Sequence, residues 1–309
     1  MKKVFIDGSA GTTGLRIFER LSERNDISLI TLPEDLRKSQ EHRKNALNDA
    51  DIAFLCLPDA AAAEAVSFVE NQNTVIIDTS TAHRTNPGWA YGFPELSEDL
   101  KEKILSSNRI AVPGCHASGF TALIHPLVKA GLLSGDADLT CHSITGYSGG
   151  GKKMIAQYEE KGNDCLFAAP RQYALSQNHK HLKEMMCFTS LKKAPVFCPI
   201  VSNFYSGMLV TVPLHKSALS YGGIDDIKEI YKKSYSGKIV YYEDNADESG
   251  FLSSAAKSGK DSMQISVYGN DERIILTARY DNLGKGASGA AVECLNLKLG
   301  VSETENLVL

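Results

Sequence analysis

The chain has 309 residues, of which 43% are hydrophobic and 23% are charged, and its formal net charge is -4. This near-average composition argues against a protein that binds nucleic acid or a membrane surface through a basic face. No apolar run approaches the roughly 20 residues of a membrane-spanning helix, and the N-terminal apolar stretch is too short for the core of a signal peptide. We therefore expect a cytoplasmic protein of about two domains.

Seven cysteines are spread along the chain, and no two of them form a CxxC pair. An odd number without such pairs is not typical of a disulfide framework or of a structural zinc site. We expect no metal, and we expect most of these thiols to be buried in apolar surroundings. Cys115 is the expected exception.

Strand and helix patterns alternate in the first part of the chain. Apolar runs ended by glycine or proline predict strands, and apolar residues at helical spacing predict helices between them. The expected strands are residues 3–7, 27–32, 52–57 and 74–78, and the expected helices are residues 15–21 and 60–69. This alternation is typical of a parallel, doubly wound sheet.

The later part of the chain has a different pattern. Several segments alternate apolar and polar residues, as half-exposed antiparallel strands do, and a helix follows at residues 287–299. The expected strands are residues 137–145, 195–200, 208–214, 239–243, 264–268 and 273–280.

These patterns predict an α/β plus α+β protein of two domains. The first is a Rossmann-like, doubly wound dinucleotide-binding domain at residues 1–115, completed by the C-terminal residues 285–309. The second, at residues 116–284, has a mixed, largely antiparallel sheet, and the family resemblance described below implies that it is the catalytic and oligomerisation domain.

A glycine-rich turn separates the first expected strand from the first expected helix. Glycines there permit a tight turn and let the backbone approach a pyrophosphate at the helix N-terminus. The spacing is GxxGxxG rather than GxGxxG, so a turn that merely joins strand to helix is the alternative. The candidate pyrophosphate-binding residues are Gly8, Ser9, Ala10, Gly11, Thr12, Thr13 and Gly14.

The second expected strand bears on the choice of cofactor. No acidic residue ends it, although one there would bind the ribose 2′-hydroxyl of NAD. Arg37 and Lys38 follow soon after, and their charges would suit a 2′-phosphate. The pattern favours NADP(H), with a solvated helix start as the alternative for these two residues.

Cys115 follows a break at Pro113 and Gly114 and opens a segment with helical periodicity. A helix N-terminus lowers the pKa of a thiol through its dipole and its N–H groups. The same N–H groups stabilise the oxyanion that forms when a thiolate attacks a carbonyl. These features favour a nucleophile over an ordinary buried cysteine.

Two histidines and a carboxylate lie together in the sequence NHKHLKE at residues 178–184. In a helix, His181 and Glu184 share one face, so the carboxylate can orient the imidazole of a catalytic base. His179 points in another direction and is a candidate substrate contact. A solvated charged helix is the alternative, and metal binding is a third, for which no further ligand is evident nearby.

Ser80 and Arg84 follow the fourth expected strand, at the end of the sheet where ligands of open parallel sheets bind. We expect Ser80 to contact the cofactor. A guanidinium at position 84 would pair with an anionic substrate, with an ordinary surface arginine as the alternative.

Two later stretches carry further candidate contacts. The glycine-rich residues 146–152 would bind an anion or form a flexible loop. Asn282 precedes a run of small residues and would pair with a carboxamide. The candidate substrate contacts in the first stretch are Ser148, Gly149 and Lys152.

Taken together, the motifs resemble the N-acetyl-γ-glutamyl-phosphate reductase family, in its short second type, within a wider group that includes aspartate-semialdehyde dehydrogenase. The resemblance covers nearly the whole chain and depends on the order and spacing of the motifs. They are GSAGTTG at 8–14, DTSTAHR at 78–84, PGCHASG at 113–119, GYSGGGK at 146–152, NHKHLKE at 178–184 and DNLGKGASGAA at 281–291.

The resemblance implies residue roles and a reaction. Cys115 is the nucleophile, His181 is the acid/base with Glu184 as its partner, and Asn282 lies by the nicotinamide. The implied reaction, in arginine biosynthesis, is the reduction of N-acetyl-γ-glutamyl phosphate by NADPH through a cysteine thioester. A homodimer or homotetramer built through the second domain is also implied. The open alternatives are an aspartyl or other acyl phosphate as substrate, and a nucleotide-binding regulator without catalysis.

Overall fold

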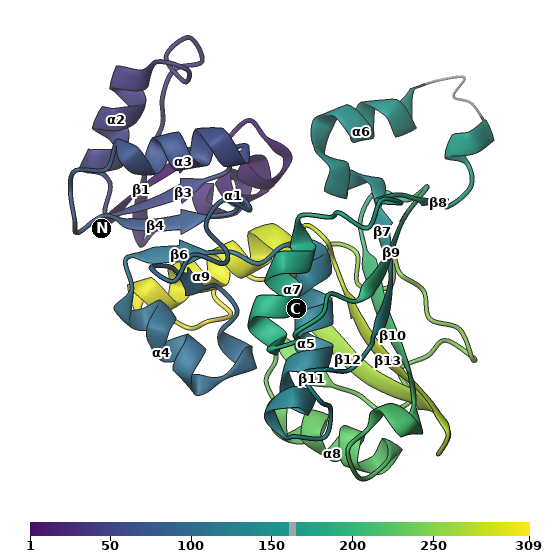
Figure 1. Ribbon diagram of the computed structural model, residues 1–309. Helices are drawn as coiled ribbons and strands as arrows, with labels where there is room; N and C mark the ends of the chain where they lie inside the picture. The colour runs from purple at the N-terminus through teal and green to yellow at the C-terminus, as the bar shows by residue number, and fades with distance from the viewer. Residues whose placement is uncertain (161–164) are drawn as a thin grey trace. The chain divides into compact units, whose positions relative to one another are not determined.

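The computed structural model describes residues 1–160 and 165–309 and divides into two compact units, each with its own sheet (Figure 1). The first unit comprises residues 1–114 and 287–307, and the second comprises 115–286 and 308–309. The second unit begins one residue earlier than the expected domain, because Cys115 is the first residue of a helix that packs on the second sheet.

The first unit contains a parallel sheet. Its strands are β1 (Lys2–Asp7), β2 (Ile27–Ile30), β3 (Ile52–Leu55), β4 (Val75–Asp78), β5 (Ala90–Tyr91) and β6 (Arg109–Ala111). They lie in the order β2-β1-β3-β4-β6-β5, and the described pairs are all parallel. The central strands β3 and β4 are wholly buried, as strands covered on both faces are. This arrangement confirms the expected doubly wound fold.

Helices cover both faces of this sheet. They are α1 (Thr12–Ser22), α2 (Gln40–Asp49), α3 (Asp59–Ser67), α4 (Glu98–Ser106) and α9 (Gly289–Leu299). Successive residues of a strand point to opposite faces. Val4 and Ile6 therefore pack with α1, α4 and α9, whereas Phe5 between them packs with α2 and α3.

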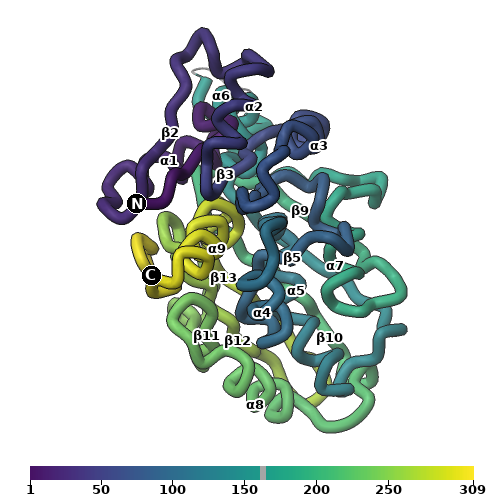
Figure 2. The backbone as a smooth tube through the Cα atoms, turned by 90° about the vertical axis from the view of Figure 1, so that its left-hand side faces the viewer, coloured from purple at the N-terminus to yellow at the C-terminus, as the bar shows by residue number. Residues whose placement is uncertain are grey.

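The last helix, α9, completes the first unit from the far end of the sequence (Figure 2). Its residues from Gly289 to Leu297 are all buried, beside α1, α4 and β4. A π-helical turn, Gly284–Ser288, leads into it.

The second unit contains a mixed sheet. Its strands are β7 (Thr140–Gly146), β8 (Arg171–Gln172), β9 (Val196–Ser202), β10 (Met208–His215), β11 (Val240–Tyr242), β12 (Met263–Gly269) and β13 (Arg273–Tyr280). They lie in the order β11-β12-β13-β10-β7-β9-β8. The pairs β7–β9 and β11–β12 are parallel and the others are antiparallel, which confirms the largely antiparallel sheet.

Helices pack on one face of the second sheet. They are α5 (Cys115–Lys129), α7 (His181–Thr189) and α8 (Ile224–Ser234), while α6 (Gly151–Glu159) follows β7. Helix α5 lies against β10 and β13, with α7 and α8 beside it. Tyr235, which follows α8, donates its hydroxyl to the Ala122 carbonyl of α5 at 2.6 Å. Short 3-10 turns lie at Pro94–Leu96, Tyr147–Gly150, Cys165–Phe167 and Lys216–Ala218.

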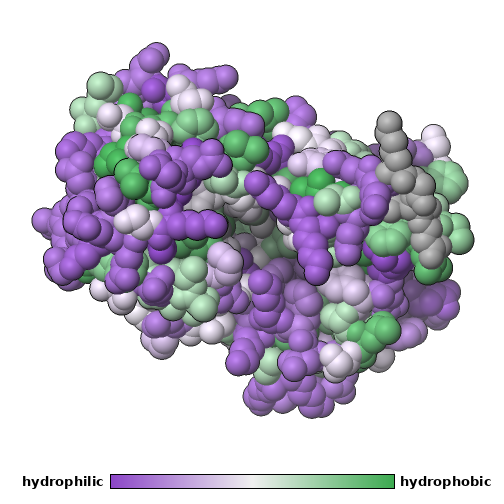
Figure 3. Space-filling view, turned by 90° about the horizontal axis from the view of Figure 1, so that it is seen from above, coloured by the Kyte–Doolittle hydropathy of each residue, from purple (hydrophilic) through white to green (hydrophobic). Residues whose placement is uncertain are grey.

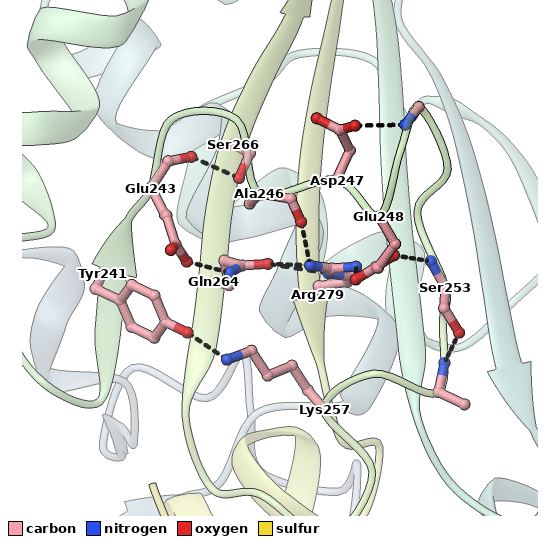
Figure 4. Close-up of polar contacts among 12 residues, drawn as sticks. Tyr241, Glu243, Ala246, Asp247, Glu248, Ser253, Lys257, Gln264, Ser266 and Arg279 are labelled. Carbon is pink, nitrogen blue, oxygen red and sulfur yellow. Dashed lines mark hydrogen bonds and ion pairs between the residues drawn. The ribbon is translucent and has the colours of Figure 1, made fainter.

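The opposite face of the second sheet is partly covered by the loop after β11 (Figure 4). The buried guanidinium of Arg279 donates to Gln264 Oε1 at 2.9 and 2.7 Å and to the Ala246 carbonyl at 2.6 Å. The same group forms an ion pair with Glu248 at 2.5 Å. One arginine of β13 thus fastens this loop to the sheet.

The face of the molecule drawn in Figure 3 is mostly hydrophilic, with small and scattered hydrophobic patches. None of the helices in the described part of the chain is both long enough and apolar enough to cross a membrane.

Candidate active site

The glycine-rich turn lies between β1 and α1. Gly8 has a φ of +90°, which favours glycine, and a Cβ there would come within 2.3 Å of the Cys56 carbonyl oxygen. Gly14 lies in the first turn of α1, where a Cβ would be 2.3 Å from the Gly8 carbonyl oxygen. The Gly11 N–H donates to that same oxygen at 2.9 Å. The turn is therefore folded too tightly for side chains at positions 8 and 14.

The start of α1 suits an anion. Gly11 is the N-cap residue and has no side chain that could cap the helix. The N–H groups of the first turn and the positive end of the helix dipole thus remain for a ligand such as a pyrophosphate. Ser9, Thr12 and Thr13 are partly exposed beside this end, and Ala10 is exposed. The narrow backbone cradle fits a dinucleotide.

Arg37 and Lys38 are both exposed, in a turn that precedes α2. The Nε of Arg37 donates to the Leu32 carbonyl at 3.2 Å, which holds the side chain near the end of β2. Their contact with a 2′-phosphate stays a prediction.

Ser80 belongs to a hydrogen-bonded turn at the end of β4. Its hydroxyl donates to Asp78 Oδ2 at 2.7 Å and its N–H donates to Asp78 Oδ1 at 2.9 Å. The His83 ring also bonds Asp78, at 2.6 Å, and stacks on Trp89 with the ring centroids 4.1 Å apart. These contacts give the loop after β4 a fixed shape.

Arg84 is buried within the first unit rather than on its surface. Its Nε donates to the Val112 carbonyl at 2.8 Å and one terminal nitrogen donates to the Thr79 carbonyl at 2.9 Å. The side chain thereby ties the loop after β4 to the segment after β6. The described bonds give Arg84 a structural task, and its substrate contact stays a prediction.

In the second unit, Cys115 is partly exposed at the first position of α5. The Tyr280 hydroxyl of β13 donates to the Cys115 carbonyl and accepts the Gly119 N–H at 3.0 Å. Gly286 approaches from the other side, where a Cβ would lie 3.0 Å from that of Cys115. The helix start that carries this thiol is therefore anchored to the sheet.

The other six cysteines lie in varied surroundings, and none of the seven forms a disulfide among the described residues. Cys141 and Cys294 are buried, and burial raises the pKa of Cys56 to about 12. The expectation that most of the thiols are buried is wrong, because Cys56, Cys115 and Cys198 are partly exposed and Cys165 and Cys187 are exposed. Cys187 faces outward because it lies on the polar side of α7.

The histidine cluster lies at the start of α7. His181 and Glu184 are both buried within the first turn of that helix. His179, just before it, accepts the His181 N–H on Nδ1 at 3.2 Å, and the two rings are 4.7 Å apart. The His181 ring is 5.6 Å from that of His116, the residue after Cys115. The structure thus brings the starts of α5 and α7 together, as the proposed chemistry requires.

His116 is a part of the site that the sequence did not reveal. This buried ring lies 2.7 Å from the Ser143 hydroxyl through Nδ1 and 2.6 Å from the Tyr173 hydroxyl through Nε2. Burial, together with the charge of His179, lowers the pKa of His116 to about 3, so the ring is neutral at pH 7. The one sequence signal that could have indicated His116 as a site residue is its place directly after Cys115, the candidate nucleophile.

The stretch at 146–152 is anchored rather than loose. Ser148 is buried and its hydroxyl accepts from Asn282 Nδ2 at 3.0 Å. Asn282 Oδ1 accepts the Gly207 N–H at 2.9 Å. Gly149 and Lys152 are exposed beyond this anchor.

Among residues 1–160 and 165–309, no group of three or more potential ligands could hold a metal ion.

Each unit has the fold of semialdehyde dehydrogenases. The family model "Semialdehyde dehydrogenase, dimerisation domain" matches residues 115–282, and "Semialdehyde dehydrogenase, NAD binding domain" matches residues 33–104. Aspartate semialdehyde dehydrogenase II of Vibrio cholerae, in a crystal structure complexed with ASA, has a TM-score of 0.74 at 16% identity and covers 97% of this chain and 98% of its own. The enzyme of Francisella tularensis has a TM-score of 0.72 at 15% identity, over 96% and 99%. At such identities the likeness concerns the fold alone.

Two relatives are similar along almost the whole sequence. A Brucella ovis protein named N-acetyl-gamma-glutamyl-phosphate reductase is 44% identical over 306 residues, 96% of this chain and 99% of that protein. A Nostoc protein named N-acetyl-gamma-glutamyl-phosphate reductase 2 is 43% identical over 317 residues, 97% and 98% of the two chains. The chain belongs to the N-acetyl-γ-glutamyl-phosphate reductase family, which confirms the resemblance seen in the motifs.

Proposed function

We propose that this protein reduces N-acetyl-γ-glutamyl phosphate to N-acetyl-L-glutamate 5-semialdehyde and phosphate, in arginine biosynthesis. The observation that carries the proposal is the 44% identity, over 96% of the chain, to a relative named for this reaction. The second unit supplies suitable groups, because a partly exposed cysteine opens α5 and histidines lie at the start of α7.

Cys115 is the proposed nucleophile. Its thiolate attacks the acyl carbon, a sulfur–carbon bond forms, and phosphate leaves with the electrons of the broken carbon–oxygen bond, so that a thioester remains. A bound nicotinamide dinucleotide supplies the hydride that reduces this thioester. The oxygen of the resulting thiohemiacetal takes a proton from His181, and His181 takes that proton back as the carbonyl re-forms, the carbon–sulfur bond breaks, the semialdehyde departs and the thiolate returns. We assign Glu184, three residues along α7, to orient His181.

The glycine turn at 8–14 is the proposed pyrophosphate site. Ser80 is a second proposed cofactor contact on the same unit, and Asn282 is proposed to meet the nicotinamide. The proposed substrate contacts are Ser148, Gly149, Lys152, His179 and Arg84. Of these five, Arg84 has the least support, because its described bonds go to backbone carbonyls.

NADP(H) is the proposed cofactor because Arg37 and Lys38 follow β2 and no acidic residue ends that strand. Replacing both with alanine removes two charges that a 2′-phosphate would meet. We expect the double variant to lose about tenfold or more in NADPH affinity and little in NADH affinity. Titration of protein fluorescence with each cofactor measures this. Equal losses for both would place the 2′-phosphate elsewhere.

A homodimer or homotetramer is the proposed assembly. The second unit matches a dimerisation domain, and the exposed Val196 and Ile275 lie on the sheet face opposite α5. Light scattering after size-exclusion chromatography gives the mass directly. A monomer at micromolar concentration would overturn this assignment.

Cysteines that form no disulfide among the described residues suit the reducing cytoplasm, where we place the protein. They also shape the assay, because Cys165 and Cys187 are exposed and will react with any alkylating reagent. We therefore choose a background in which both are serine, so that loss of activity on alkylation reports on Cys115.

The first test runs the reaction in reverse, with N-acetylglutamate semialdehyde, phosphate and NADP. Phosphate-dependent reduction of the cofactor, abolished by alkylation in the C165S/C187S background, is the expected result. Aspartate semialdehyde is the comparison substrate, and a preference for it would change the substrate but keep the mechanism. A folded protein that binds NADP and reduces neither would support the non-catalytic alternative.

Two variants test the residue roles. Cys115→Ser is expected to keep cofactor affinity and lose turnover, because only the thiolate is removed. His181→Asn is expected to lower kcat by about 10²–10⁴-fold, the usual range for a positioned acid/base. If His179→Asn is the damaging change instead, the two histidines exchange roles.

A further inference from the structure

A chain of side-chain hydrogen bonds reaches the site from the core of the second unit. It begins at Ser143 on β7, passes through the His116 ring and ends at the Tyr173 hydroxyl, with steps of 2.7 and 2.6 Å. Phe197 packs edge-on against the same ring at 5.3 Å. Ser143 is 0% exposed, His116 3% exposed, and Tyr173 partly exposed, so the chain leads outward.

Ser143, at the buried end of this chain, determines which group donates and which accepts in each of the two hydrogen bonds. Ser143 has no second hydrogen-bond acceptor for its hydroxyl within the described part of the chain. A buried O–H without an acceptor is costly, so Ser143 donates to His116 Nδ1. The ring is neutral, and its one proton is then on Nε2, which donates to the Tyr173 oxygen. The Tyr173 O–H is therefore left to donate to something else.

We propose that Tyr173 donates this hydrogen bond to the oxyanion that forms when Cys115 adds to the acyl carbon, and that His116 and Ser143 are positioning residues for it. The proposal rests on the function proposed above. The Tyr173 backbone is held by its N–H, which donates to the Pro199 carbonyl of β9 at 3.0 Å. The phenol lies 2.6 Å from the ring of His116, the residue that follows Cys115 in the chain. Burial and the charge of Cys115 both raise the pKa of Tyr173, so the hydroxyl keeps its proton.

The step involves no proton transfer from tyrosine. As the sulfur–carbon bond forms, the carbonyl π electrons move to oxygen, and the Tyr173 O–H stabilises that negative charge. When the charge returns to re-form the carbonyl, the bond to phosphate breaks and phosphate leaves with its electron pair. Three aligned hydrogen bonds polarise one another in the same direction, which strengthens the last of them.

The kinetic test is Tyr173→Phe in the intact enzyme, which removes one oxygen. We expect kcat to fall about 10²-fold with KM little changed, as for loss of one oxyanion donor. Ser143→Ala should lose about tenfold, the value of one hydrogen bond. His116→Gln, whose amide can still donate to Tyr173, should retain more activity than His116→Phe. The matched control is Tyr221→Phe, which removes an exposed hydroxyl bonded to the Ala130 carbonyl. Wild-type kcat in Tyr173→Phe would overturn the proposal.

Two measurements need no substrate and separate this proposal from the proposed function. The ¹⁵N shifts of His116 should show a protonated Nε2 and an unprotonated Nδ1, and the reverse would overturn the proposed direction. The pH profile of Cys115 alkylation, in the C165S/C187S background, should be the same with and without the Tyr173 hydroxyl. A shifted profile would assign that hydroxyl to the thiolate instead. A wild-type enzyme inactive on the acetylated semialdehyde would refute the proposed function, while these two readouts would still test the hydrogen-bond chain.

Discussion

The Tyr280 hydroxyl occupies an unusual place, since it bridges two backbone groups of α5. It accepts the Gly119 N–H and donates to the carbonyl of Cys115. Gly119 permits this contact, because a Cβ there would lie 2.6 Å from the tyrosine oxygen. Burial raises the pKa of Tyr280, so the hydroxyl keeps its proton for this task. One side chain of β13 thus sets the position of the helix end that carries Cys115, the proposed nucleophile.

Removal of this bridge is expected to damage both stability and chemistry. Tyr280→Phe leaves two buried backbone groups without their partner, which costs about 1–3 kcal/mol in the free energy of unfolding. It also lets the first turn of α5 move, so kcat should fall. Urea unfolding and turnover measure the two effects, with Tyr221→Phe as the control. An unchanged free energy of unfolding would contradict the bridging role.

Some residues of the candidate site could be predicted from the sequence, and others could not. Cys115, His181 and Glu184 could be predicted because each depends on a helix start or on helical spacing, which are local properties. Tyr173 could not be predicted, because its position depends on the pairing of β8 with β9, a contact between distant segments. The structural contacts of Arg84 could not be predicted either, because its backbone partners, the Val112 and Thr79 carbonyls, lie in two different loops.

At the scale of elements, the turn between β1 and α1 depends on two glycines that touch one another. A Cβ on residue 14 would lie only 2.3 Å from the Gly8 carbonyl oxygen, which is closer than two such atoms can approach. Adding a methyl group at 14 must therefore push the turn away from the helix, in the region proposed to hold the pyrophosphate.

Gly14→Ala is expected to weaken dinucleotide binding by about tenfold or more and to lower the free energy of unfolding by about 1–3 kcal/mol, as overpacking does. Calorimetric titration with NADPH and urea unfolding give the two values. Gly88→Ala is the control in the same unit, because its Cβ would meet nothing closer than 3.4 Å. Undiminished NADPH affinity in Gly14→Ala would show that the turn does not hold the cofactor.

Several elements with a strong local pattern were predicted, and helices α2 and α8 were among those missed. The segments expected as β1, β3 and β4 overlap the observed strands, because runs such as Ile52–Leu55 are wholly apolar. Helix α2 escaped prediction because Ala46 and Leu47 are its only apolar residues, and burial of this pair gives no repeat. Helix α8 did carry a signal, with Ile227 and Tyr231 one turn apart on its buried side.

At the scale of the whole molecule, the free energy of unfolding should depend on pH because several histidines are buried. Burial lowers the pKa of His116 to about 3 and of His179 to about 4, and it lowers that of His125 as well. In the unfolded chain these groups titrate near about 6.5. Between about pH 6.5 and pH 4 the unfolded chain therefore binds more protons, and the free energy of unfolding falls as the pH falls.

The buried His116 contributes at most about 1.4 kcal/mol per pH unit over this window. Urea unfolding from about pH 7.5 to about pH 4.5, at constant protein concentration, measures the slope. His116→Asn should show a shallower slope, with His215→Gln at an exposed site as the control. A free energy of unfolding that stays constant from about pH 7 to about pH 5 would contradict this account.

The place of α9 has a consequence for how the protein is made. Residues 1–114 leave the ribosome first, but part of the cover of one face of their sheet comes from residues 289–299, which leave after the strands of the second unit. The sheet of the second unit is complete by Tyr280. The later-synthesised unit can thus close first, while the nascent N-terminal sheet waits with an apolar face uncovered, the kind of surface that chaperones hold.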